Sequence, residues 1–167
     1  MLSQQVPVLT AKAWLLLDAN ERKDPLIVAR AVTRMAQLGG SVEARTWLAP
    51  SWDQLTQHSP EGVEALAFAL CETVEGLETE WLARLDKVSQ EALRAPALGL
   101  AVGLALAERQ LWGKARVLLL SAAKDNQLQG RRRRQAYVML ARLAEKEQRL
   151  DDAQSFWRQA ALVESGV

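Results

Sequence analysis

Apolar residues recur at helical spacing along almost the whole chain, whereas the strict alternation of apolar and polar residues that marks a strand is missing. Two apolar runs are nowhere separated by an Asn-Gly or Asp-Gly turn. The pattern therefore predicts an all-α protein. The expected helices span 7–20, 25–38, 41–57 with a bend near Pro50, 60–75, 77–92, 96–110, 112–124, 132–148 and 150–163.

Prolines and glycines punctuate this pattern. The pairs Asp24-Pro25 and Ser59-Pro60 each place a capping side chain before a proline at the first helical position, so both predict helix starts. Glycines mark the expected breaks between helices: Gly39-Gly40, Gly76, Gly113 and Gly130. Very short turns make neighbouring helices antiparallel, so the sequence predicts helical hairpins.

The length of 167 residues suits a single domain. We predict one helical-repeat domain over 1–167, with the helix at 7–20 as an N-terminal cap. The expected hairpins are degenerate at about 25–57 and 60–92, and clearer at 96–124 and 132–163.

The two clearer hairpins share one spacing of small residues. Gly103 precedes Ala115 by 12 positions, and Ala141 precedes Ala153 by the same 12, so the repeats are 38 residues apart (153 minus 115). Small residues let the two helices of a hairpin cross closely. Large residues four positions later are expected to fill the space between hairpins: Leu119 and Trp157.

This spacing resembles the tetratricopeptide pattern, W-x2-L-G-x2-Y followed by A-x3-F, although Gly99 stands where an aromatic residue is expected. The resemblance implies that antiparallel hairpins stack as a tetratricopeptide-like right-handed solenoid.

A narrower resemblance covers about residues 60–163. The segments "ETEWLARL", "ALGLAVGLALAERQLWGKARVLL" and "MLARLAEKEQRLDDAQSFWRQAAL" are similar to the C-terminal tetratricopeptide region of bacterial HemY proteins. That resemblance implies an inner-membrane protein associated with late protohaem biosynthesis, anchored by an N-terminal segment absent from this chain. It implies that this domain is soluble and leaves open on which side of the membrane it lies.

Charge and cysteine content exclude several classes of function. Lys and Arg number 21 against 20 Asp and Glu, and the net charge of +1 predicts no general attraction to nucleic acid or to a membrane surface. Cys71 is the only cysteine, which rules out an intrachain disulfide. The longest apolar run, 96–107, is shorter than the ~20 residues that a membrane span needs, so it predicts a buried helix.

Candidate catalytic groups are few. His58, the only histidine, lies in a polar turn, and the carboxylates Glu75, Glu78 and Glu80 fit solvated helix faces. We therefore predict no enzyme activity, no metal site and no cofactor. Porphyrin or haem binding in an apolar groove between hairpins is the alternative.

The tetratricopeptide resemblance implies protein binding along a concave face. In that register the partner-binding residues are Leu100, Leu104, Glu108, Gln135, Val138, Arg142, Glu145 and Lys146. For the two leucines the other interpretation is plain packing, because their helix is apolar all round. Trp112 is a further candidate partner contact, either a wedge between hairpins or an exposed residue.

Four consecutive arginines begin a predicted helix, where the helix dipole does not favour cations. They are either a solvated linker or a contact with an anionic partner or lipid: Arg131, Arg132, Arg133 and Arg134. The sequence thus predicts a noncatalytic protein–protein interaction scaffold, with haem-biosynthesis enzymes as candidate partners and without nucleic-acid binding.

Overall fold

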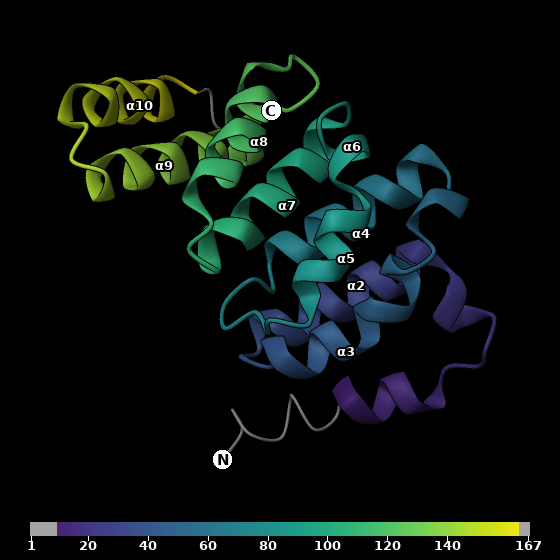
Figure 1. The fold of residues 1–167 in the computed structure, drawn as a ribbon. Helices are drawn as coiled ribbons and strands as arrows, with labels where there is room; N and C mark the ends of the chain where they lie inside the picture. The colour runs from purple at the N-terminus through teal and green to yellow at the C-terminus, as the bar shows by residue number, and fades with distance from the viewer. Residues whose placement is uncertain (1–9, 164–167) are drawn as a thin grey trace. The chain divides into compact units, whose positions relative to one another are not determined.

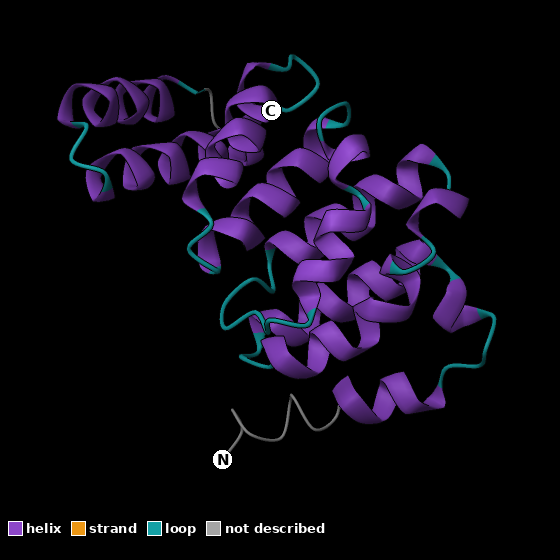
Figure 2. Cartoon of the chain, viewed as in Figure 1, coloured by secondary structure: helices purple, strands orange, loops and turns teal. Residues whose placement is uncertain are grey.

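The computed structural model describes residues 10–163, and in this part of the chain every regular element is a helix (Figures 1 and 2). The all-α prediction is confirmed, and the helix packing is compatible with a helical repeat. None of the helices in 10–163 combines the length and the apolar character needed to cross a membrane.

A first helix spans 10–16. The other elements are η1 (Glu21–Lys23), α2 (Pro25–Gln37), α3 (Ser41–Trp52), η2 (Leu55–Gln57), α4 (Pro60–Cys71), α5 (Trp81–Lys87), α6 (Ser89–Ala92), α7 (Pro96–Glu108), α8 (Trp112–Lys124), α9 (Gly130–Lys146) and α10 (Leu150–Leu162).

The chain packs as two compact units, an N-terminal unit Met1–Arg84 and a C-terminal unit Leu85–Val167. In the first, α2 packs against both α3 and α4; in the second, α7 packs against α8, α8 against α9, and α9 against α10. The assignment of 1–167 to a single domain stays a prediction.

Both predicted helix caps are confirmed. The Asp24 carboxylate accepts a hydrogen bond from the Leu26 N–H at 2.9 Å, and the Ser59 hydroxyl accepts one from the Gly62 N–H at 3.2 Å. Each satisfies a backbone donor of the first helical turn that has no partner within the helix.

Three helix pairs in the described chain end their first helix with the same turn: α2–α3, α7–α8 and α9–α10. A residue with positive φ follows each first helix, namely Gly39 (89°), Gln110 (63°) and Gln148 (58°). The next N–H then donates to the carbonyl five residues earlier, at 2.9, 2.9 and 2.8 Å. This is the Schellman arrangement, which satisfies carbonyls at the helix end and reverses the chain.

An alanine follows each of these left-handed residues by five positions. Ala44, Ala115 and Ala153 are 0%, 0% and 3% exposed. Twelve positions before them lie Gly103 and Ala141 in the C-terminal hairpins but Val32 in α2, so α2–α3 shares the buried alanine of the second helix and not the small residue of the first. A small buried side chain at this point lets paired helices cross closely.

Other expectations need correction. Gly113 lies inside α8 without a positive φ, and the turn is made by Gln110, so Gly113 does not mark the break between α7 and α8. The predicted helix 77–92 is interrupted, because α5 and α6 are separate and residues 72–80 form a loop before them. The predicted helix 41–57 ends at Trp52, and only 10–16 of the expected 7–20 is seen as helix, with 7–9 outside the described residues.

The C-terminal unit shows why glycine is needed at particular points of α7. A Cβ on Gly103 would lie 2.8 Å from the Leu119 side chain, and one on Gly99 would lie 2.7 Å from the Ala92 carbonyl oxygen. Leu119 is fully buried as expected, whereas Trp157, the equivalent residue of α10, is 40% exposed. Trp157 is therefore not the buried wedge that the sequence predicts.

Gly99→Ala and Gly113→Ala are expected to have opposite effects on stability. The new methyl at 99 would press on a backbone oxygen, so the free energy of unfolding should fall by about 1–3 kcal/mol. Residue 113 is helical, and a Cβ there would have no other atom within 4 Å. Gly113→Ala should therefore raise the free energy of unfolding by up to about 1 kcal/mol. Urea denaturation of the two variants tests both; equal midpoints would contradict the packing at Gly99.

Candidate protein-binding groove

A groove of about 380 Å³ runs along the N-terminal unit between α2 and α4. Its lining residues are Leu26, Ala29, Arg30, Thr33, Arg34, Gln37 and Ala65. The floor is formed by small residues, because Ala29 is buried and Ala65 and Thr33 are half-buried. Leu26 is 51% exposed at one end, so apolar surface remains accessible there.

The groove occupies the register that the sequence assigned to a partner-binding face. Leu100, Leu104 and Glu108 lie 10, 6 and 2 positions before the left-handed Gln110. The same offsets from Gly39 give Ala29, Thr33 and Gln37, and all three line the groove. The sequence prediction applied this register only to the C-terminal repeats, because the match of the first hairpin to the repeat is weaker.

Two arginines define the electrostatics of the groove. Arg30 and Arg34 are exposed and four residues apart on α2, so they lie on one face of the helix, one turn apart. Neither makes a hydrogen bond or ion pair with another described residue, and none of the lining residues is acidic. The nearest acidic residues in α4, Glu61 and Glu64, are exposed outside the lining.

The starts of α2 and α4 pack closely against each other. Gly62 is buried, and a Cβ there would lie 2.8 Å from the Pro25 ring, so the first turns of α2 and α4 approach closely. Both helices begin near this contact, and they pack against each other.

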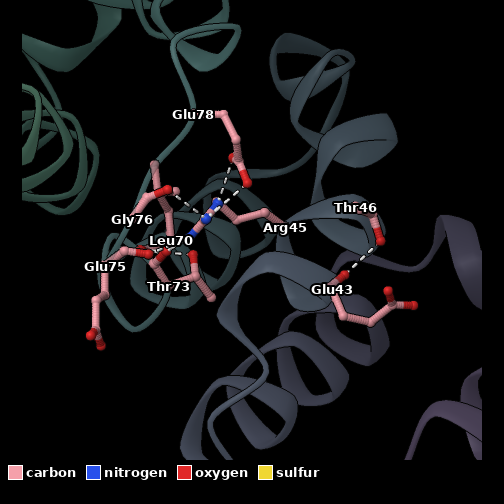
Figure 3. A network of polar contacts seen from close by, with 8 residues as sticks. All are labelled: Glu43, Arg45, Thr46, Leu70, Thr73, Glu75, Gly76 and Glu78. Carbon is pink, nitrogen blue, oxygen red and sulfur yellow. Dashed lines mark hydrogen bonds and ion pairs between the residues drawn. The ribbon is translucent and has the colours of Figure 1, made fainter.

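The end of α4 is fixed by Arg45, which projects from α3 and is 1% exposed (Figure 3). Its guanidinium donates to the carbonyl of Thr73, to that of Glu75 at 2.9 Å and to that of Gly76 at 3.1 Å. It also pairs with both carboxylate oxygens of Glu78 at 2.9 Å. One side chain therefore organises the whole loop that follows α4.

The Glu78 carboxylate balances the buried charge of Arg45. Hydrogen bonding from Arg45 lowers the pKa of Glu78 below its ordinary value, against the opposing effect of burial. The interpretation of Glu78 as a solvated carboxylate was therefore wrong. No sequence motif marks this pair, because its members are 33 residues apart.

An arginine in the same position acts in the C-terminal unit. Arg116 follows Ala115 as Arg45 follows Ala44, and it binds Glu147 in the α9–α10 turn at 3.0 Å. In each unit, an arginine on the second helix of a hairpin thus forms an ion pair with a glutamate in the loop or turn after the next long helix.

The predicted partner-binding residues of the C-terminal unit differ in how far they are exposed. Leu100 and Leu104 are buried, at 0% and 3% exposure, as the packing interpretation expected. Gln135 and Val138 are half-buried, and the remaining four are exposed: Glu108, Arg142, Glu145 and Lys146. Their role in partner binding stays a prediction.

Two of these residues contact tryptophans. The Lys146 ammonium lies 5.4 Å from the centre of the half-buried Trp112 ring, and Glu145 accepts a hydrogen bond from the Trp157 indole. Trp112 is therefore partly covered by α9, which favours its role as a wedge at the α7–α8 turn.

The four consecutive arginines belong to the first turns of α9 and not to a linker. Arg133 donates to the Ala123 carbonyl at 2.9 Å, and Arg134 donates to the carbonyls of Ala160 at 3.2 Å and Val163 at 2.7 Å. They cap the ends of the neighbouring helices α8 and α10. Arg132 bonds Gln135 at 3.1 Å, and Arg131 is exposed.

The potentially reactive side chains of His58 and Cys71 lie at opposite ends of α4. His58 is half-buried in the turn before α4, and Cys71 is a buried free thiol. Within 10–163, His, Cys, Asp and Glu side chains do not gather in a group that could hold a metal ion.

Comparison with known proteins gives no relative. No family model, no curated protein and no solved structure matches the chain.

Glu78→Gln is expected to change the pH dependence of stability. Because the pKa of Glu78 is lowered by folding, its contribution is present above the ordinary value of 4.5 and is lost as the pH falls through the folded-state pKa. The variant should lose about 1–3 kcal/mol of unfolding free energy at pH 7 and show a weaker decline toward pH 3. Urea denaturation between pH 7 and pH 3 measures both.

Glu75→Gln is the matched control. Glu75 lies in the same loop, but only its backbone carbonyl contacts Arg45 and its carboxylate points away (Figure 3). If both variants follow the same pH profile, the ion pair does not govern this loop.

Proposed function

We propose that the chain is a noncatalytic helical-repeat scaffold, with its hairpins in a tetratricopeptide-like solenoid, that binds an acidic segment of a partner protein in the α2–α4 groove. The observation that supports this most strongly is the pair Arg30 and Arg34. Both are exposed above a floor of small residues and lack carboxylate partners in 10–163. Charge complementarity of this kind selects partners and speeds their association.

The dimensions of the groove suit a short extended segment. Residues 26 to 37 of α2 span roughly 16 Å along the helix, which matches about five extended residues. The guanidinium groups one helical turn apart are separated by about the distance between alternate residues of an extended chain. Two acidic residues separated by one position would therefore reach both arginines.

A link to late haem biosynthesis at a bacterial inner membrane is part of the proposal and rests on the sequence resemblance alone. Porphyrin binding stays the alternative, without a contact that favours it. Titration with protohaem, followed at the Soret band, tests it.

Arg30→Glu/Arg34→Glu is expected to weaken binding of an acidic peptide. The probes are the acetylated peptide Leu-Glu-Leu-Glu-Leu and its counterpart with both glutamates replaced by glutamine. We expect the acidic peptide to shift α2 and α4 amide resonances saturably, and the charge reversal to weaken binding at least about tenfold. Isotope-edited NMR titration of the full chain measures this.

Lys87→Glu/Arg94→Glu serves as the control, because both residues are exposed outside the groove and the net charge changes equally. Equal weakening in the two double variants, or equal affinity for the two peptides, would overturn the groove as the binding site. The predicted residues Arg142 and Lys146 are compared in the same way by Arg142→Glu/Lys146→Glu.

A further inference from the structure

A second cavity, of about 640 Å³, lies in the C-terminal unit where α9 begins and α10 ends. It is lined by Asn126, Gln129, Gly130, Arg133, Tyr137, Gln159, Leu162 and Val163. Its volume falls within the roughly 300–1,000 Å³ typical of sites for small ligands. The residues that line the α2–α4 groove do not line this cavity, so each site can be tested independently of the other.

The described residues that line this cavity carry several hydrogen-bond donors and no carboxylate. It combines the guanidinium of Arg133, the phenol of Tyr137 and the carboxamides of Asn126, Gln129 and Gln159. Leu162 and Val163 add an apolar wall on the α10 side. Such a set suits a ligand with one strongly hydrogen-bonding group and a less polar body.

Three of the carbonyls that would repel an anion here accept hydrogen bonds from arginines. The ends of α8 and α10 carry partial negative charge. The Arg133 Nε donates to the Ala123 carbonyl, and Arg134 donates to those of Ala160 and Val163. The Nη1 group of Arg133 makes no hydrogen bond to another described residue, so it remains free for a ligand.

The backbone at the start of α9 also favours a bound anion. Its first turn has no side-chain cap and no acidic residue, and Gly130 at this point is a lining residue. Asp125, the nearest acidic residue in the preceding loop, accepts a hydrogen bond from the Gln127 N–H at 2.9 Å and is absent from the lining. The local charge is therefore positive.

We propose that this cavity binds the phosphate group of a small ligand. A phosphate accepts hydrogen bonds on several oxygens at once, which matches a guanidinium and several carboxamides around one space better than a carboxylate with two oxygens does. The Tyr137 phenol donates instead to the Ala123 carbonyl at 3.5 Å. The phosphate belongs either to a soluble phosphomonoester or to a lipid headgroup, and the experiment below separates the two.

The test is a titration of the ¹⁵N-labelled full chain at constant ionic strength with inorganic phosphate and with glycerol 3-phosphate. We expect saturable shifts of the Gln129, Gly130 and Gln159 amides. Arg133→Gln should weaken binding about tenfold, because it removes the only charged side chain among the described residues of the lining. Lys114→Gln, an exposed change near the start of α8, should leave binding unchanged.

Because Arg133 also caps α8, Gln159→Leu is a second variant on the exposed side of α10 and should weaken binding a few-fold without loss of fold. Co-sedimentation with phosphatidylglycerol vesicles, against phosphatidylcholine vesicles, identifies a headgroup if it depends on Arg133. Shifts that do not saturate, or that Lys114→Gln reduces as much as Arg133→Gln, would indicate an adventitious ion only and overturn the site.

Discussion

The buried alanine at the crossing point of each hairpin is the constraint on which the rest of the structure depends. Ala44, Ala115 and Ala153 each follow a left-handed residue by five positions, so the turn geometry and the crossing point are fixed together. A larger side chain there would separate the paired helices and move every residue of the second helix relative to the first.

The crossing point also determines where the following arginine is aimed. Arg45 and Arg116 come directly after the alanines of their hairpins, and both bind a glutamate in a turn more than thirty residues away. Arg45 is buried and shares its charge among three carbonyls and Glu78, which offsets the cost of removing it from water. Arg116 is half-exposed, so its ion pair contributes less.

The sequence predicts the fold class and many helix boundaries because those depend on local signals. Periodicity gives the helices, and Asp24 and Ser59 cap them as expected. The left-handed turns at Gln110 and Gln148 are not predicted by local signals, because glutamine, unlike glycine, does not favour a positive φ. Gly113 predicts the break between helices at the wrong residue. It lies in α8, and a Cβ there would have no other atom within 4 Å.

The sites were harder to predict, because they depend on burial and on contacts distant in sequence. An apolar residue in the right register lines a groove only where its helix face is uncovered, and Leu100 and Leu104 are buried. The equivalent positions in α2 became recognisable once Gly39 was seen to match Gln110. Likewise, the run of four arginines gained a physical meaning only when α8 and α10 were found to end beside it.

The near-zero net charge conceals an uneven division of charge between structural and accessible groups. Several half-buried or exposed carboxylates form ion pairs with arginines, including Glu78, Glu147 and Asp53. The arginines of the α2–α4 groove have no such partner in the described chain, and the second cavity contains a guanidinium without a carboxylate. Pairing inside the fold thus leaves both open surfaces positive, and a balanced composition remains compatible with local selection of anionic groups.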